Sequence, residues 1–230
     1  METKYFLIIL DLIVYQSSCK SQIDRNDNDS LIITILYEEK SINDSILAGF
    51  GFSCLVENSK NLCLFDAGGK PNIIIQNMNN VEVDYSKINY VFISHIHDDH
   101  IGGLHGVLAK CNQPELYLPF SYPQMPGELL GERAENDFKE LLNRYKPLGS
   151  EMILKKESVN IADKFFTTGM LEDQTYEQAL IVPTAKGLII ITGCAHTGIL
   201  EIVGRSKELL KQMFILLWAD FVLCGSIRCR

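Results

Sequence analysis

Four side chains that can bind a metal ion lie within one hexapeptide. They are His95, His97, Asp99 and His100, spaced as His-x-His-x-Asp-His. In an extended segment His95 and His97 leave the backbone on the same face, so both imidazoles can bind one ion. Asp99 and His100 come where the chain is expected to turn into a helix, so they point to a neighbouring position. Zinc binds imidazole and carboxylate ligands, and the sequence therefore predicts a zinc site here.

A catalytic zinc site keeps one coordination position open for water. The bound water ionises at about pH 7 and becomes a hydroxide nucleophile. The alternative is a histidine-rich surface turn that holds no ion. The hexapeptide contains three of the chain's 5 histidines and directly follows an apolar strand, which favours the metal site. His105 lies farther along and is expected to be a helix residue, or at most a neighbour of the ligands.

The segments around the hexapeptide predict an α/β domain. Asn89–Ser94 and Gly187–Thr192 are continuous apolar runs, typical of strands that are buried on both faces. Phe50–Glu57 and Asn61–Phe65 predict a hairpin. Strands come first and then mix with helices, which favours a layered α/β fold. The other expected elements are a strand at Leu31–Tyr37, an amphipathic helix at Arg133–Lys146, a helix at Ile199–Met213 capped by Thr197, and an irregular loop at Pro119–Gly131 that either serves the site or is a surface excursion.

The His-x-His-x-Asp-His signature resembles that of the metallo-β-lactamase-fold hydrolases. Leu64–Gly68 is similar to the strand and turn that precede the metal motif in these enzymes, and its Asp66 would support the site from behind the ligands. Gly193–His196 follows an apolar strand, as a later ligand segment does. The resemblance runs from about residue 31 to residue 204 and implies an αββα sandwich.

A narrower resemblance is to the dihydropterin-linked ribofuranosylaminobenzene phosphate synthases of this superfamily. It rests on three segments: Gly49–Ser53, Glu177–Leu180 and Gly187–Ile199. The name of this branch implies a condensation that involves a pterin and a phosphorylated, ribosylated aromatic amine. The sequence has no evident phosphate-binding loop, which favours hydrolysis over that condensation.

The superfamily resemblance also implies which residues hold each ion. His95, His97 and His196 would bind a first ion, and Asp99 and His100 a second. Asp99 could also take the proton of the bridging water. His196 would then be the distant partner of the hexapeptide, and the alternative is a core or helix-capping histidine.

The sequence departs from the superfamily pattern at two places. Where members commonly carry a bridging Asp, this chain has Cys194, which is either a thiolate ligand of zinc or a small buried hydrophobe. Members also supply a His from a late Gly-Gly-Phe-His-like segment, but no His follows His196, and Asp220 is the one conceivable substitute. We expect either a member truncated or frame-disrupted at its C-terminus, or a site with one tightly bound ion and a weak second one.

The N-terminal residues are expected to be an export signal. An apolar run at residues 5–15 is too short to span a bilayer, which takes about 20 residues. Two serines then precede Cys19, as in a bacterial lipoprotein signal whose Cys carries a lipid. An Asp inside the run and a Gln before the serines depart from that pattern, and the alternative is an N-terminal strand or helix with an incidental Cys. The sequence thus predicts a signal at 1–18, a polar tether at 19–30 and a metallo-β-lactamase-like domain at 31–230.

This signal predicts an exported protein, anchored by a lipid on Cys19 to a bacterial membrane and facing the periplasm or the exterior. The alternative is a cytoplasmic protein. Export would permit disulfides, but the 7 cysteines have no tight pairing pattern, so the chain is not a disulfide scaffold.

The composition excludes several other classes of protein. Of 230 residues, 47% are hydrophobic and 22% charged, which excludes a disordered chain, a coiled coil and a polytopic membrane protein. The net charge of −8 argues against a nucleic-acid partner. The predicted function is therefore a zinc-dependent hydrolase, in which a metal-bound hydroxide attacks an ester, phosphoester or related bond of a small molecule. The alternatives are a synthase like those of the branch and a metal-binding protein that lacks turnover because the late His is missing.

Overall fold

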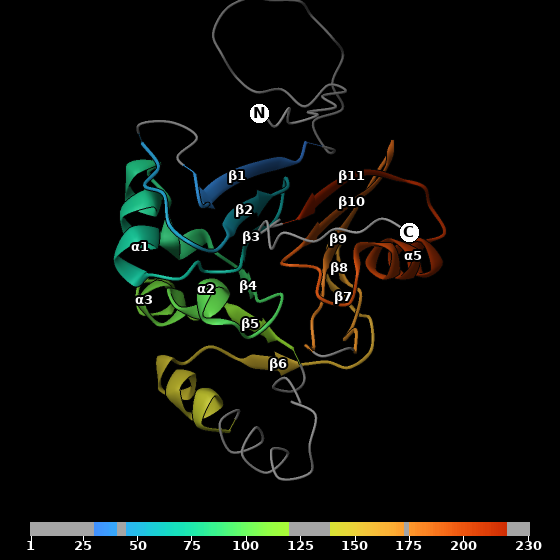
Figure 1. Ribbon diagram of the computed structural model, residues 1–230. Helices are drawn as coiled ribbons and strands as arrows, with labels where there is room; N and C mark the ends of the chain where they lie inside the picture. Colours follow the sequence, from blue (N-terminus) through green and yellow to red (C-terminus); the bar gives the residue numbers. More distant parts are fainter. Residues whose placement is uncertain (1–29, 41–44, 120–138, 173–174, 220–230) are drawn as a thin grey trace, which may run out of the picture.

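Two β-sheets pack face to face, with helices on both outer faces (Figure 1). The computed structural model describes residues 30–40, 45–119, 139–172 and 175–219. Strand order is β1-β2-β3-β4-β5-β6 in the first sheet and β11-β10-β9-β8-β7 in the second. The strands are β1 (Ile32–Tyr37), β2 (Ser53–Glu57), β3 (Leu62–Phe65), β4 (Tyr90–Phe92), β5 (Glu115–Leu118), β6 (Met152–Leu154), β7 (Asn160–Ala162), β8 (Phe165–Thr167), β9 (Leu180–Thr184), β10 (Gly187–Thr192) and β11 (Phe214–Ala219).

Helices cover the outer face of each sheet and complete the αββα sandwich that the resemblance implied. Several helices lie against the first sheet, whereas α5 covers the second sheet (Figure 1). The helices are α1 (Pro71–Asn80), α2 (Asp98–Ile101), α3 (Leu104–Leu108), a helical segment at 139–145 and α5 (Ile199–Leu210), with short 3₁₀ turns η1 (Tyr85–Lys87) and η2 (Lys146–Leu148).

Strand periodicity explains the layers, because successive side chains of a strand point to opposite faces of its sheet. In β4, Val91 packs under the helices of the first sheet, whereas Phe92 packs between the two sheets. In β10, Ile190 faces α5 and Ile191 faces the first sheet. Both strands are therefore apolar at consecutive positions, as the sequence predicted.

The expected elements agree with the structure except at their ends. β2 and β3 form the predicted antiparallel hairpin. The helix expected at Ile199–Met213 ends at Leu210, because Lys211 adopts a left-handed conformation with φ 52° and β11 begins at Phe214.

Several expectations concern residues that the structure does not describe. The predicted signal and nearly all of the tether, most of the loop at Pro119–Gly131 and the first residues of the helix at Arg133–Lys146 lie outside the described part of the chain. Within the part that is described, no helix has the length and apolar character needed to cross a bilayer.

Candidate metal centre

The predicted ligands gather at one edge of the sandwich, where strands of both sheets end. β3 and β4 run parallel, so their carboxyl ends are adjacent, and the Asp66 N–H donates to the Phe92 carbonyl oxygen at 2.8 Å. His95 follows β4 of the first sheet, whereas Cys194 and His196 follow β10 of the second. The site is therefore assembled from segments that are distant in the sequence.

Three histidines form the first group of possible ligands. The ring centroids of His95 and His97 are 4.6 Å apart, and His196 lies 4.9 Å from His95 and 4.8 Å from His97. One ligand nitrogen of each ring lies within 4.8 Å of those of the other two. His95 is buried, His97 half-buried and His196 exposed, so the group reaches from the interior to the surface.

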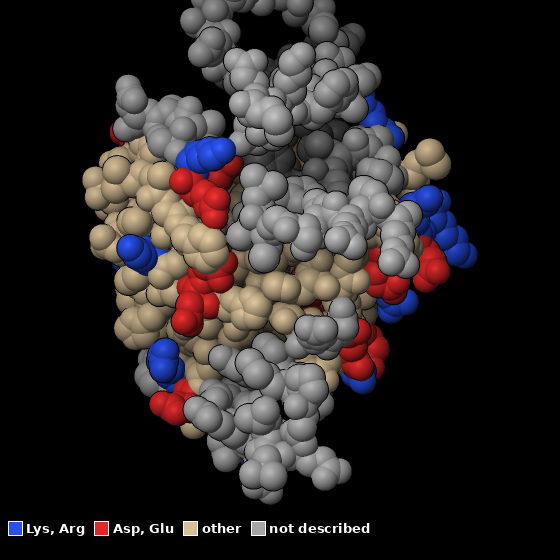
Figure 2. Space-filling model, viewed as in Figure 1, with Lys and Arg blue, Asp and Glu red and all other residues tan. Residues whose placement is uncertain are grey.

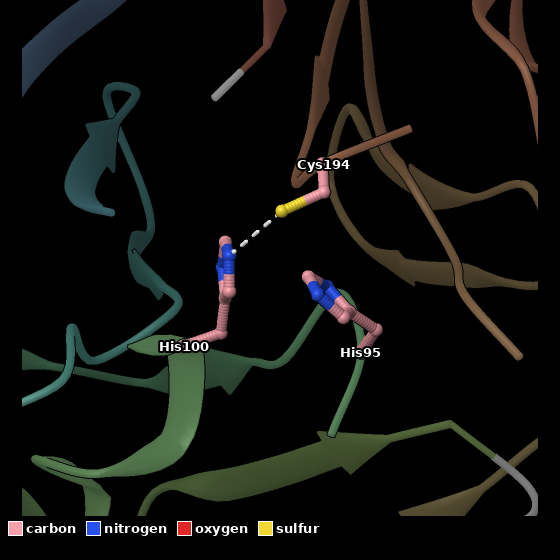
Figure 3. A group of neighbouring side chains, drawn as sticks. All are labelled: His95, His100 and Cys194. Atoms are coloured by element: carbon pink, nitrogen blue, oxygen red, sulfur yellow. Dashed lines mark hydrogen bonds between the residues drawn. The ribbon is translucent and has the colours of Figure 1, made fainter. Parts of the chain in front are cut away.

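A second group of possible ligands shares His95 with the first. It joins His95 to His100 and Cys194, and their ligand atoms also lie within 4.8 Å of one another (Figure 3). The His100 Nε2 atom is 3.3 Å from the Cys194 Sγ atom and 3.4 Å from the Asp99 Oδ2 atom. The structure therefore brings together all five residues that the resemblance implied as ligands, and adds a thiol to them.

Asp66, directly after β3, fixes the position of two of the rings. Its Oδ1 atom accepts a hydrogen bond from the Ser94 N–H, and its Oδ2 atom accepts one from the Ser94 hydroxyl, both at 2.7 Å. The His100 Nδ1 atom lies 2.7 Å from the same Oδ2 atom and must donate, because a carboxylate only accepts. Asp66 is fully buried, so this network is shielded from water.

The network determines which nitrogen of each ring faces the cluster. The Ser94 hydroxyl gives its proton to Asp66, so it accepts from the His95 Nδ1 atom, which lies 2.9 Å away. Both His95 and His100 then carry a proton on Nδ1 and present Nε2 as the possible ligand atom. The His95 Nε2 atom is buried and has no hydrogen-bond partner in the structure. A buried lone pair without a donor, with two other rings beside it, fits a bound cation.

Local electrostatics favour the unprotonated, metal-binding forms of two rings. Burial, followed by the charges of the neighbouring histidines, lowers the pKa of His95 well below its usual range, and burial also lowers the pKa of His97. Burial alone would lower the pKa of His100 too, but the Asp66 carboxylate raises it well above its usual range. Burial raises the pKa of Asp99, but its hydrogen bond to His100 and the charge of that ring outweigh this effect and lower it. At neutral pH, His95 and His97 are therefore neutral and Asp99 is ionised.

Glu177 positions His196, a role that the sequence analysis did not assign. Its carboxylate is fully buried, and it accepts hydrogen bonds from the His196 N–H at 3.1 Å and from the Thr197 N–H and hydroxyl, both at 2.6 Å. In the sequence, the segment Glu177–Leu180 carries only a family resemblance. No local signal indicates this role, because Glu177 lies in a polar stretch at residues 172–178 and its burial follows only from the fold.

Gln178 ties the two halves of the site together. Its side-chain amide donates to the Ile93 carbonyl oxygen at 2.9 Å, and its backbone N–H donates to the Ser94 carbonyl oxygen at 2.8 Å. The Thr167 hydroxyl of β8 donates to the amide oxygen of Gln178 at 3.1 Å. The strand that carries His95 is therefore held against the second sheet, which carries His196.

The predicted cap of α5 is wrong. The residue at the N-cap position is Gly198, and no side chain caps the helix there. Thr197 lies one residue before the N-cap, and its hydroxyl donates to the buried Glu177 carboxylate. Thr197 thus helps to fix the neighbouring His196.

The remaining candidates lie apart from the cluster or outside the described residues. His105 is exposed on α3, so the expectation of a helix residue is confirmed, and it belongs to neither group of possible ligands. Asp220 and the residues after it are not described. The cysteines that the structure describes form no disulfide with one another: Cys54, Cys63, Cys111 and Cys194.

The family model of the metallo-beta-lactamase superfamily matches residues 46–199, which include both ligand groups. The chain belongs to the metallo-beta-lactamase superfamily. This membership confirms the resemblance seen in the hexapeptide. It also shows that the chain has a fold of the kind found in metal-dependent hydrolases. Proteins with this fold usually bind zinc.

Similar proteins within this superfamily carry two kinds of name. A 7,8-dihydropterin-6-methyl-4-(β-D-ribofuranosyl)-aminobenzene-5′-phosphate synthase of Methanocaldococcus jannaschii is 26% identical over 215 residues, which are 77% of this chain and 72% of that protein. The crystal structure of Tm1679, a metal-dependent hydrolase of the beta-lactamase superfamily, has a TM-score of 0.60 and 25% identity, over 85% of this chain and 78% of the other. A quorum-quenching N-acyl homoserine lactone lactonase shares the fold, with a TM-score of 0.52, 14% identity and coverage of 87% and 95%.

Proposed function

We propose that the protein is a zinc-dependent hydrolase that acts on an ester, phosphoester or related bond of a small molecule. The observation that carries this proposal is the convergence of His95, His97 and His196 around a buried ring nitrogen that has no partner. When bound there, zinc lowers the pKa of a coordinated water to about 7 and polarises a substrate oxygen. The protein supplies the remaining functions through its own side chains.

The side chains around the cluster have separable roles in this proposal. His95, His97 and His196 would hold the first ion, and Asp99 and His100 the second. Asp66 and Ser94 orient two of these rings, and Glu177 holds the backbone of His196 in place. Asp99 is partly exposed at 16% of its side chain and ionised at neutral pH, so it can accept a proton from the attacking water.

The distribution of charge supports a small-molecule substrate. On the face shown in Figure 2, Lys and Arg side chains lie beside Asp and Glu side chains, and the described residues form no continuous basic patch there. A nucleic-acid substrate would require such a patch to neutralise its phosphates.

The test combines metal analysis with a substrate panel. The full chain is stripped of metal, reloaded with zinc, and assayed on a phosphodiester, a lactone and a β-lactam. We expect the zinc-loaded protein to turn over at least one substrate. In His97→Ala, turnover should fall more than about 100-fold, which exceeds the usual effect of losing a residue that only supports a ligand. His105→Ala, which changes a histidine outside the cluster, should retain both zinc and turnover. A protein with zinc bound and no turnover on any substrate would favour the degenerate alternative.

A synthase is the second candidate, because the relative from Methanocaldococcus jannaschii carries that name. The same zinc-loaded protein is incubated with a reduced pterin and a ribofuranosylaminobenzene phosphate, and the products are analysed by mass spectrometry. A condensation product that needs His97 would favour the synthase. Turnover in the hydrolase panel without such a product would favour hydrolysis.

A further inference from the structure

Cys194 places a thiol at the edge of the histidine cluster. Its Sγ atom lies 3.3 Å from the His100 Nε2 atom, and with His95 the two residues form a compact group of possible ligands (Figure 3). The thiol is half-buried, unlike Cys54 and Cys63, which are fully buried among apolar side chains between the sheets. Its surroundings are therefore those of a ligand and not those of a small core hydrophobe.

The turn after β10 directs Cys194 towards the cluster. Gly193 has no side chain, and a Cβ atom at this position would overlap the Ser94 hydroxyl and lie 2.9 Å from the His95 Nδ1 atom. Ala195 adopts a left-handed conformation with φ 54°, which is unfavourable for a residue with a side chain. Through this turn Cys194 reaches one group of possible ligands and His196 the other. Backbone strain at such a place is typical of functional sites.

A second observation points to bound cations in the cluster that Cys194 joins. The His95 Nε2 atom is buried without a hydrogen-bond partner, and His95 belongs to both groups of possible ligands. The superfamily resemblance assigns His95 to the first ion, with His97 and His196. The donors left for a second ion are then Asp99 Oδ2 and Cys194 Sγ, which lie 3.4 and 3.3 Å from His100 Nε2.

We infer that Cys194 is a thiolate ligand of the second metal ion, which it binds together with His100 and Asp99. This inference rests on the proposed function, because it places a second ion beside the first. Binding releases the thiol proton and the Nε2 proton of His100 to solvent, so that both atoms can bind the ion. Sulfur stands where related proteins commonly carry a bridging carboxylate, so the second position should favour zinc over magnesium, calcium and manganese, which prefer oxygen ligands.

Cobalt(II) is the probe of choice, because a cobalt–thiolate bond gives a charge-transfer band in the near ultraviolet that cobalt–imidazole bonds do not. The metal-free full chain is titrated with cobalt(II). We expect this band to develop in the wild type and to be absent in Cys194→Ser, with affinity for the second ion weakened at least about tenfold, the lower end of the cost of losing a partner in a metal site. Cys111→Ser is the matched control, since Cys111 is also a half-buried cysteine outside any disulfide but lies away from the cluster, and it should keep the band.

Alkylation of the wild type gives a second readout, which needs no variant and so does not depend on whether a variant folds. Iodoacetamide labelling of Cys194 and Cys111 is followed by mass spectrometry with and without zinc. Zinc should protect Cys194 and leave the labelling of Cys111 unchanged. Equal labelling of Cys194 at saturating zinc would overturn the inference.

The outcomes separate this inference from the proposed function. Two bound cobalt ions without a charge-transfer band, or a band that survives Cys194→Ser, would overturn the inference and leave the hydrolase proposal intact. A band that needs Cys194, in a protein without turnover on any substrate, would support the inference and count against the hydrolase.

Discussion

Ser94 connects Asp66 to His95 and thereby determines which nitrogen of that ring faces the cluster. The hydroxyl donates to the carboxylate and accepts from the ring. The ring therefore keeps its proton on Nδ1, next to Ser94, and presents Nε2 to the cluster. His100 reaches the same carboxylate oxygen directly. One buried acidic residue thus orients two rings, which explains why an Asp directly after β3 matters to a site built from histidines.

Glu177 provides a test of positioning at the scale of a single residue. Glu177→Gln keeps the shape of the side chain but sets an amide NH₂ group against one of the three donors that the carboxylate now accepts from. We expect a loss of about 1–3 kcal/mol in the free energy of unfolding, the usual cost of an unsatisfied buried group. Zinc affinity should fall about 10- to 100-fold, the usual cost of losing an outer partner.

Urea denaturation and competition with a zinc chelator would measure the two effects. Glu208→Gln, which changes an exposed carboxylate of α5, is the control and should alter neither quantity. An unchanged zinc affinity in Glu177→Gln would show that His196 does not need this carboxylate, or that it is not a ligand.

The parts of the site that could be predicted are those whose residues lie close together in the sequence. The spacing of His95, His97, Asp99 and His100 predicts that they lie together, and the structure shows this proximity, while their role as ligands stays a prediction. His196 required a resemblance, since a lone histidine gives no sign of which residue it will meet. The partners of Glu177 lie 19 and 20 residues away in the sequence. The residues next to Glu177 do not indicate that the chain folds back to bring these partners to it.

At the scale of elements, the strands were easier to predict than their ends. Buried strands such as β10 carry a continuous apolar run, because a strand covered on both faces in a layered fold has no side exposed to water. The end of α5 depends instead on the left-handed conformation of Lys211, and the role of Thr197 depends on a distant partner. The N-cap is Gly198, one residue later than expected, and the Thr197 hydroxyl donates to the distant Glu177 carboxylate.

The loop before β2 gives a prediction about how elements meet at the site. Gly51 has φ 120°, and a Cβ atom there would overlap the backbone oxygen of Asp99. Gly51→Ala should therefore lower the free energy of unfolding by about 2–4 kcal/mol, through backbone strain and a clash that cannot relax. It should also weaken zinc binding, because the segment that carries the ligands must move.

Gly204→Ala is the matched control in the same protein. A Cβ atom at Gly204, inside α5, meets nothing within 4 Å. Alanine should stabilise the protein by about 0.5–1 kcal/mol at this helical position. Guanidinium denaturation would measure both variants, and the explanation fails if the two changes have the same sign.

At the scale of the whole molecule, the first residues predict where the protein is found. We propose that the chain is exported and anchored by a lipid on Cys19, on the pattern of residues 1–30. Cys19→Ala should move the protein from the membrane fraction to the soluble fraction of a bacterial host, whereas Cys111→Ala should not. Equal partitioning of Cys19→Ala and the wild type would refute the anchor.

The metal ion should also contribute to the stability of the whole sandwich, because its ligands come from both sheets. His95 and His97 follow β4 of the first sheet, and His196 follows β10 of the second. An ion that binds all three can remain bound only while the sheets stay packed. Zinc at 100 times its dissociation constant should therefore stabilise the folded state by about 2.7 kcal/mol.

For a chain of this size, that stabilisation corresponds to a rise in Tm of roughly 5–10 °C. Differential scanning calorimetry of the metal-free and the zinc-loaded protein would measure it. His196→Ala should lose most of the shift, because the second sheet no longer contributes to the first ion, while His105→Ala should keep it. If zinc binds but Tm is the same with and without it, the ion is not held between the two sheets in the folded state.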